Sequence, residues 1–359
     1  MRKLLYLSVA SLLMFACSNE DSVPLENNDG KITFEISTSN AMNDGMTRTP
    51  VYSQDASQKI ATVNVYAFKN DGSGNYTYQK TYAIPGWTAG LAFKRYAVPD
   101  ADKVPAGDYK FLAVGTDNPN LYTLTSLTVG TTKFDDMMAS VTAAGNESEI
   151  FAGYSQVQVL DNGSRISIEM KRKVAGILGY FKNVPQNING TTVQYLRLTI
   201  SNSDLKVNLT NGTGSAPTGT AYRIMDINVG TQTVANGVYT GNDLSGQGVV
   251  KLDNSQLGGT FLIPISGVTM TLGLYDASNN ALKEWVIQDA GGITNLNIMA
   301  NNFYSLGLKT KVDSTNGGGT PDPTDDDSAI DLLLDQSIVL TVTPTWDALH
   351  NLIIQNQVP

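Results

Sequence analysis

Apolar and polar residues alternate along this chain in short runs, and turns rich in Asn, Asp and Gly separate the runs. The first clear run places Ile32, Phe34 and Ile36 on one face and polar side chains on the other. A period of two is the pattern of a β-strand with one buried face. Turns at this spacing are typical of β-sandwiches. The pattern predicts an all-β protein, with one helical stretch at 129–143 in a loop insertion.

Length and charge narrow the class of protein. The 359 residues are enough for two domains of roughly 100–200 residues each. Charged residues make up 16% of the chain, and the formal net charge is -9. A chain poor in Lys and Arg lacks the cations that neutralise phosphates. We therefore predict no nucleic-acid partner.

The amino terminus predicts export. Arg2 and Lys3 precede an apolar stretch at 4–15, which is too short to cross a hydrocarbon core of roughly 30 Å. The stretch ends in Ala16-Cys17 and resembles a bacterial lipobox, in which the cysteine is acylated. Cys17 is the only cysteine of the chain, which excludes an intramolecular disulfide and a thiolate zinc site. The alternative is an ordinary secretory signal with an incidental cysteine.

The carboxy-terminal region has two parts. Residues 313–329 are rich in Gly, Pro and Asp and predict an extended linker. Apolar alternation then returns, first at Ile330, Leu332 and Leu334 and again in the run 338–342. A β-prone tail held on a linker is an aggregation hazard unless it has a binding place.

Catalysis finds little support in the sequence. One histidine, His350, and one cysteine leave no conventional Ser-His or Cys-His pair in the mature chain. Asp325–Asp327 lack the Gly and Glu spacing of a calcium loop. We predict that the chain is not an enzyme and has no cofactor and no metal. A surface lipoprotein that binds glycans through Trp87, Trp285 and tyrosines is the alternative from another functional class.

Several short motifs occur in an order that resembles the fimbrillin family, the lipoprotein pilins of type V pili. They are Lys31-Ile32-Thr33-Phe34, Thr47-Arg48-Thr49-Pro50, Val104-Pro105-Ala106-Gly107-Asp108-Tyr109, Met170-Lys171-Arg172-Lys173-Val174-Ala175-Gly176-Ile177 and Asn301-Asn302-Phe303-Tyr304-Ser305-Leu306. The resemblance implies two tandem transthyretin-like Greek-key β-sandwich domains followed by a donor-strand tail. It also implies strand exchange: the precursor is cut at an arginine, its first strand leaves, and a neighbour's carboxy-terminal strand replaces it.

Carried onto this chain, the resemblance implies lipidation at Cys17 and proteolytic cleavage between Arg48 and Thr49. The displaced strand then carries Ile32, Phe34 and Ile36, and the donor strand carries Ile338, Leu340 and Val342. The expected segments are a signal peptide at 1–16, a lipid-anchored propeptide at 17–48, an N-terminal domain at 49–161, a C-terminal domain at 162–312, a linker at 313–329 and a donor-strand tail at 330–359.

The implied function is that of a structural pilin subunit at the cell surface. Its expected partners are other pilin subunits in a head-to-tail polymer, the outer membrane through lipid on Cys17 before processing, and a host or bacterial surface ligand. The expected location is an outer-membrane-anchored precursor and then an extracellular fimbrium.

Alternatives stay open for two of these segments. Arg48 is also compatible with a solvated loop residue. The donor could lie in residues 330–343, in 351–358 or in both, and the tail could instead fold back on its own domain. A tail that folds back would make the chain a monomeric adhesin or an anchor.

One charged residue interrupts a buried face. Strict alternation points Arg172 inward with Ile168 and Met170, where a carboxylate or backbone carbonyls would have to hold it. A β-bulge that returns Arg172 to solvent is the alternative.

Overall fold

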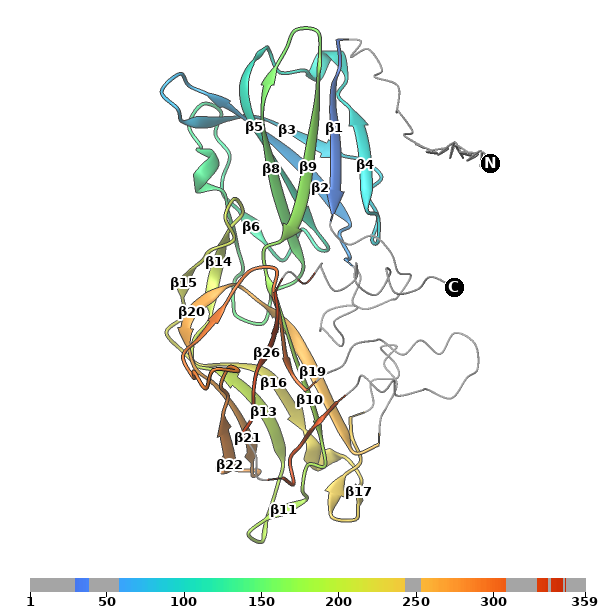
Figure 1. Ribbon diagram of the computed structural model, residues 1–359, viewed down its shortest axis with the longest axis vertical. Coiled ribbons are helices and arrows are strands. Elements are labelled where there is room, and N and C mark those ends of the chain that lie inside the picture. The colour runs from blue at the N-terminus through green and yellow to red at the C-terminus, as the bar shows by residue number, and fades with distance from the viewer. Residues whose placement is uncertain are drawn as a thin grey trace, which may run out of the picture.

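The computed structural model describes residues 30–38, 58–242, 253–307, 328–334, 337–344 and 346. Within them the chain forms two β-rich halves stacked along the long axis of the molecule (Figure 1). The helices of the described residues are three short 3-10 turns, η1 Asp100–Asp102, η2 Phe134–Asp136 and η3 Val229–Thr231. The all-β prediction is confirmed.

The first half is built on a seven-stranded sheet in the order β3-β2-β5-β8-β9-β1-β4. Phe34 on β1 packs against Tyr82 on β3 and Phe111 on β5, so the β1 end of the sheet faces the β3 end across a core. The strands are β1 Ile32–Thr38, β2 Thr62–Asn70, β3 Tyr76–Ile84, β4 Phe93–Ala97, β5 Gly107–Thr116, β8 Ile150–Val159 and β9 Ser164–Arg172.

The second half contains two larger sheets, β19-β10-β24-β26 with β25 also paired to β10, and β16-β13-β21-β22. Their strands are β10 Ala175–Lys182, β13 Tyr195–Ile200, β16 Tyr222–Asn228, β19 Ser255–Leu262, β21 Met270–Tyr275, β22 Ala281–Val286, β24 Phe303–Leu306, β25 Ile330–Asp331 and β26 Thr341–Thr343. The small pairs are β11 Asn187–Ile188 with β12 Thr191–Thr192, β17 Val234–Ala235 with β18 Val238–Tyr239, and β20 Ile265–Val268 with β23 Leu296–Ile298.

A sheet with strands from both halves joins them. It pairs β6 Thr123–Leu124 and β7 Met138–Ser140 with β14 Asp204–Asn208 and β15 Gly214–Pro217. A buried cluster at the junction also contains residues from both halves, including Tyr122, Phe261 and Trp346. The junction is therefore a packed interface that contains a residue of the carboxy-terminal tail.

The domain boundary expected at Asn162 lies later in the chain. Every residue of β9 except two pairs with β1, and Phe151 and Ala152 on β8 pair with the end of β9, so residues 164–172 complete the first sheet. The chain enters the second half between Arg172, where β9 ends, and Ala175, where β10 begins. The turn at Asn162 joins two strands of one sheet, and such turns look the same in sequence as turns between domains.

The helix expected at 129–143 is wrong. This segment contains the single turn η2 and the short strand β7, and Phe134, Met137 and Ala139 are buried. Pairing of β7 with β14 outweighs the local preference for a helix. Among the described residues, no helix is long and apolar enough to cross a membrane.

Candidate functional site: the first strand and the C-terminal tail

Strand β1 lies inside its sheet. It pairs in parallel with β9 from Ile32 to Thr38 and antiparallel with β4 from Thr33 to Ser37. Both edges of β1 are thus hydrogen-bonded, and its loss would leave β4 and β9 with unpaired edges.

The inner face of β1 contributes to the core. Ile32, Phe34 and Ile36 are at most 2% exposed, and all three belong to the core of the first half. Burial of each large apolar side chain stabilises by roughly 1.5–3 kcal/mol. The sequence prediction of a half-buried strand is confirmed, whereas its displacement from the fold stays a prediction.

The outer face of β1 carries an electrostatic clamp. The carboxylate of Glu35 pairs with Arg95 on β4, with 2.9 Å between Oε1 and Nη2, and also with Arg165 on β9. The hydrogen bond from Arg165 is the main cause that lowers the pKa of Glu35. Both arginines are over 40% exposed, so solvent and salt weaken each pair and it stabilises by about 0–1 kcal/mol. The two ion pairs therefore add little stability, and their main effect is to favour the register in which Glu35 lies between the two arginines.

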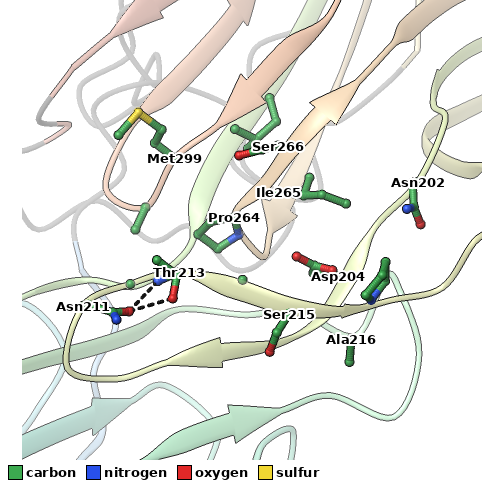
Figure 2. A pocket seen from close by; sticks show the side chains of 15 residues that line it. Asn202, Asp204, Asn211, Thr213, Ser215, Ala216, Pro264, Ile265, Ser266 and Met299 are labelled. Atoms are coloured by element: carbon green, nitrogen blue, oxygen red, sulfur yellow. Dashed lines mark hydrogen bonds between the residues drawn. The ribbon is translucent and has the colours of Figure 1, made fainter. Parts of the chain in front are cut away.

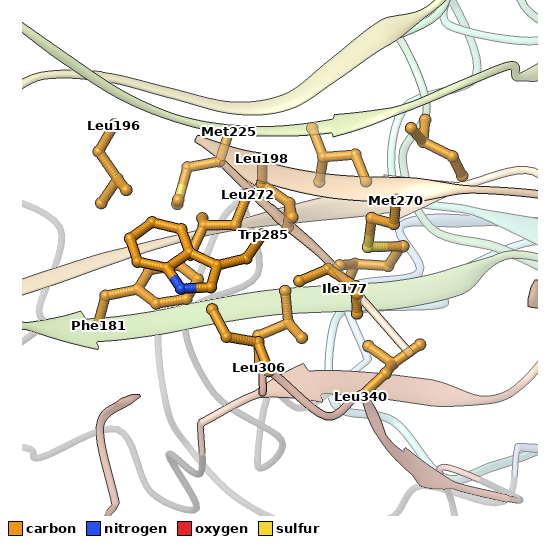
Figure 3. Close-up of a cluster of buried hydrophobic side chains, with 14 of the residues drawn as sticks. Ile177, Phe181, Leu196, Leu198, Met225, Met270, Leu272, Trp285, Leu306 and Leu340 are labelled. Atoms are coloured by element: carbon orange, nitrogen blue, oxygen red, sulfur yellow. The ribbon is translucent and has the colours of Figure 1, made fainter. Parts of the chain in front are cut away.

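The tail lies on the second half of its own chain. Strand β26 pairs antiparallel with β24, and the backbone N–H of Leu340 donates to the carbonyl of Gln288 at 2.7 Å. Ile338 and Leu340 are buried, whereas Val342 is 40% exposed. Figure 3 shows Leu340 beside Leu306 and Ile177 in the core of this half. Of the alternatives left open by the sequence, the structure has the tail folded back on its own domain.

Trp346 fixes the end of the described tail. Its side chain is fully buried, and its ring centroid lies 4.9 Å from that of Phe303. Its backbone N–H donates to the carbonyl of Asn301 at 2.7 Å. Gly176 makes room for the indole, because a Cβ at Gly176 would lie 2.5 Å from a ring carbon. No pattern in the sequence indicates this role for Trp346.

Arg172 points inward, as strict alternation predicts, and a carboxylate holds it. Its Nε donates to Oε1 of Glu149 at 2.9 Å, and both side chains are at most 5% exposed. The guanidinium also lies 4.2 Å from the ring of Trp346 and 4.8 Å from that of Phe151. Burial raises the pKa of Glu149, and the charge of Arg172 opposes that rise. Arg172 thus connects the strand beside β1 to the docked tail.

Glu147 lies two residues before Glu149 and gives a pH prediction. Burial raises its pKa from 4.5 to about 7, and its Oε1 has no hydrogen-bond partner among the described residues. The folded chain therefore binds more protons than the unfolded chain between pH 4.5 and 7, and stability falls as pH rises through this window. We expect Glu147→Gln to flatten this slope in urea unfolding between about pH 5 and pH 8. An unchanged slope would contradict the raised pKa.

The other residues that the sequence singled out lie either outside the described residues or inside the two cores. Cys17, Arg48 and Thr49 lie outside the described residues, so lipidation and cleavage stay predictions. Trp87 and Trp285 are at most 8% exposed and lie in the two cores, which removes them as a glycan-stacking face. Among the described residues, no group of three His, Cys, Asp or Glu side chains could hold a metal ion.

A groove lies between the β14–β15 hairpin and the turn before β20 (Figure 2). Its lining includes Asp204 and Asn211, and the Oδ1 of Asn211 accepts hydrogen bonds from the backbone N–H and the hydroxyl of Thr213 at 2.9 and 2.8 Å. None of the described residues of β1 or of the tail lines this groove.

The fold defines an all-β protein whose two terminal segments complete its own sheets. A family model described as fimbrillin-A associated anchor proteins Mfa1 and Mfa2 matches residues 25–345, and the chain belongs to this family. The resemblance to fimbrillins is thereby confirmed, and the chain is a fimbria-associated protein of the cell surface. No curated protein matches the sequence.

Solved structures with a partly similar arrangement include the following three. A candidate adhesin from Bacteroides ovatus is 16% identical, with a TM-score of 0.44 over 77% of this chain and 89% of that chain. A candidate cell adhesion protein from Parabacteroides distasonis is 10% identical, with a TM-score of 0.45 over 88% and 96%. The fimbrial anchor protein Mfa2 from Porphyromonas gingivalis is 12% identical, with a TM-score of 0.43 over 77% and 90%.

Proposed function

We propose that this chain is a lipid-anchored fimbrial subunit that joins its neighbour by exchange of strand β1. One observation carries the proposal: β1 lies between two strands, fills the core with three apolar side chains, and precedes a segment, 39–57, that contains Arg48. A strand in that position can be removed by a single cut and replaced by another extended segment.

The cut makes the exchange one-way. While β1 is covalently attached, its effective concentration at its own position is high, and an incoming strand competes poorly. Cleavage after Arg48 removes that advantage, because the released strand is diluted and the new strand forms ladder hydrogen bonds of about 1 kcal/mol each. The same cut separates the folded chain from lipid on Cys17.

Arg48→Ala tests this function. We expect wild-type chains sheared from the cell surface to begin at Thr49 without lipid, and Arg48→Ala chains to stay acylated at Cys17 as unpolymerised monomers. Intact mass and N-terminal sequencing give both results. Arg223→Ala, at an exposed position elsewhere in the fold, should behave as wild type. Fibres of normal length in the Arg48→Ala strain would contradict the proposal.

An anchor that keeps β1 is the second candidate. It is favoured by the family description, which names anchor proteins, and by the tail, which Trp346 holds on its own chain. A retained β1 would leave the lipid attached and close the subunit to a donor strand. Wild-type chains that begin at acylated Cys17 would support this candidate over the first.

A further inference from the structure

We infer that tail segment 328–334 of a second copy of this chain, rather than the run 338–342, fills the position of β1, with Asp331 between Arg95 and Arg165. This inference rests on the proposed strand exchange and names its donor. It follows from what the β1 position requires of any strand that occupies it.

The β1 position has an apolar and an ionic requirement. The inner face accepts apolar side chains where Ile32, Phe34 and Ile36 now lie. On the outer face, Glu35 is hydrogen-bonded by guanidiniums from both neighbouring strands, and the hydroxyl of Ser167 lies 3.3 Å from its other carboxylate oxygen. A strand without a carboxylate at the place of Glu35 would lie between Arg95 and Arg165 without offering the partner that they share. Repulsion between the two guanidiniums would then make binding of that strand less favourable.

The run 338–342 lacks the ionic feature. Its alternate positions, Val339 and Thr341, would take the place of Glu35 in one strand direction or the other, and neither is a carboxylate.

Segment 328–334 meets both requirements when it runs opposite to β1. The matches are Leu334 on Ile32, Leu332 on Phe34, Asp331 on Glu35, Ile330 on Ile36 and Ser328 on Thr38. In the same direction as β1, Asp331 would still match Glu35, but Ser328 would fall on Ile32 in the core. The antiparallel direction is therefore the one that fits.

Segment 328–334 is only partly buried where it now lies, so it can bury more apolar surface elsewhere. Leu333 and Leu334 are more than half exposed, and β25 pairs with β10 at two residues, Ile330 and Asp331. Leu332 is buried in the second half and the amide of Asn183 donates to Asp331 at 2.9 Å, so donation gives up both contacts. Transfer to the β1 position would bury Leu334 fully. The twenty residues 308–327 that precede this segment can span at most about 70 Å.

A displacement assay tests the inference on the whole mature chain. The chain begins at Ser18, carries a specific protease site after Arg48 and a dye on its N-terminal segment, and is cut while folded. Excess synthetic peptide is then added, and release of the dye-labelled strand is followed by fluorescence anisotropy. We expect peptide 328–334 to release β1 and its Asp331→Asn form to do so about two- to fivefold more slowly, as expected for the loss of exposed charge pairs.

Peptide 337–343 should release β1 weakly, and its Val339→Glu form should gain activity because the antiparallel reading puts Val339 at the place of Glu35. The Thr341→Glu form, which is the matched peptide for the opposite strand direction, should gain less activity.

Variants of the protein test the same contact. Arg165→Gln should reduce the difference in release rate between peptide 328–334 and its Asp331→Asn form, and Arg223→Gln should leave that difference unchanged.

The assay distinguishes failure of the donor assignment from failure of the proposed strand exchange. A fully cut chain from which no peptide releases β1 would overturn the proposed strand exchange itself. Release by peptide 337–343 as fast as by 328–334, or equal release by the Asp331→Asn form, would overturn the donor assignment and leave strand exchange standing.

Discussion

Replacing Glu149 by Ala is expected to lower the free energy of unfolding by about 3–5 kcal/mol. The guanidinium of Arg172 is fully buried, and the substitution removes the carboxylate that lies 2.9 Å from it. The backbone N–H of Lys59 also loses its acceptor, Oε2 of Glu149. A charge buried without its partner costs more than the pair itself contributes, which is why this effect is large.

Urea unfolding of a soluble chain that begins at Ser18 measures this loss. Glu35→Ala is the matched control, because it removes a carboxylate whose arginine partners are largely exposed, and we expect at most about 1 kcal/mol there. The double variant Glu149→Leu with Arg172→Met should recover part of the loss, since it removes the buried guanidinium together with the carboxylate. A loss below about 1 kcal/mol for Glu149→Ala alone would show that Arg172 does not depend on this carboxylate.

The inward direction of Arg172 could be predicted from sequence because β9 is a regular strand, and its partner could not. Glu149 precedes β8 in an irregular segment, and its contact with Arg172 depends on the register in which β8 pairs with β9. Trp346 was less predictable still. Its place beside Gly176 joins residues far apart in the chain, and no local period encodes such a contact.

For strand β1, too, the buried face could be predicted from sequence and the contacts with other strands could not. Alternation predicts the inner face of β1 residue by residue, because that pattern depends on the strand alone. The neighbours of β1 are non-local: one of them, β9, lies far along the chain and runs parallel to it. The ion pairs of Glu35 could therefore not be predicted from sequence, because they depend on β4 and β9 lying on either side of β1.

Apolar alternation also cannot say whose core a strand will fill. Residues 330–334 and 338–342 alternate equally well in sequence, and each run has both buried and exposed apolar residues. Leu332, Ile338 and Leu340 lie in the core of the second half, whereas Leu333, Leu334, Val339 and Val342 are exposed. Charge separates the two runs, because Asp331 is the one carboxylate in either run, and Glu35 defines where a carboxylate is needed. The outward-facing residues thus carry information on partners that the apolar pattern lacks.

A donor role for 328–334 requires the rest of the tail to leave its own domain. Leu334 and Ile338 are separated by three residues, so the first segment cannot reach a neighbour while Ile338 and Leu340 stay buried. Trp346, the last described residue of the tail, contacts Phe303, Asn301 and Arg172. The barrier to donation is then the free energy that docks Trp346 and the strand before it.

Replacing Trp346 by Ala is accordingly expected to weaken tail docking by about 3–5 kcal/mol, which is at least about a hundredfold in the docking equilibrium. Hydrogen exchange should show this as faster exchange of the amides of β26, with the amides of β2 and β5 unchanged. Gly176→Ala should act in the same direction, because its methyl group takes the space of the indole. Val342→Ala, on the same strand but 40% exposed, is the control and should change little.

The same variants connect docking to assembly. If undocking limits donation, Trp346→Ala chains cut after Arg48 should polymerise faster than wild type at equal concentration, as measured by light scattering. Slower polymerisation together with a freed tail would mean that Trp346 itself contacts the neighbouring subunit. Unchanged exchange of the β26 amides in both Trp346→Ala and Gly176→Ala would refute the idea that the indole holds the tail.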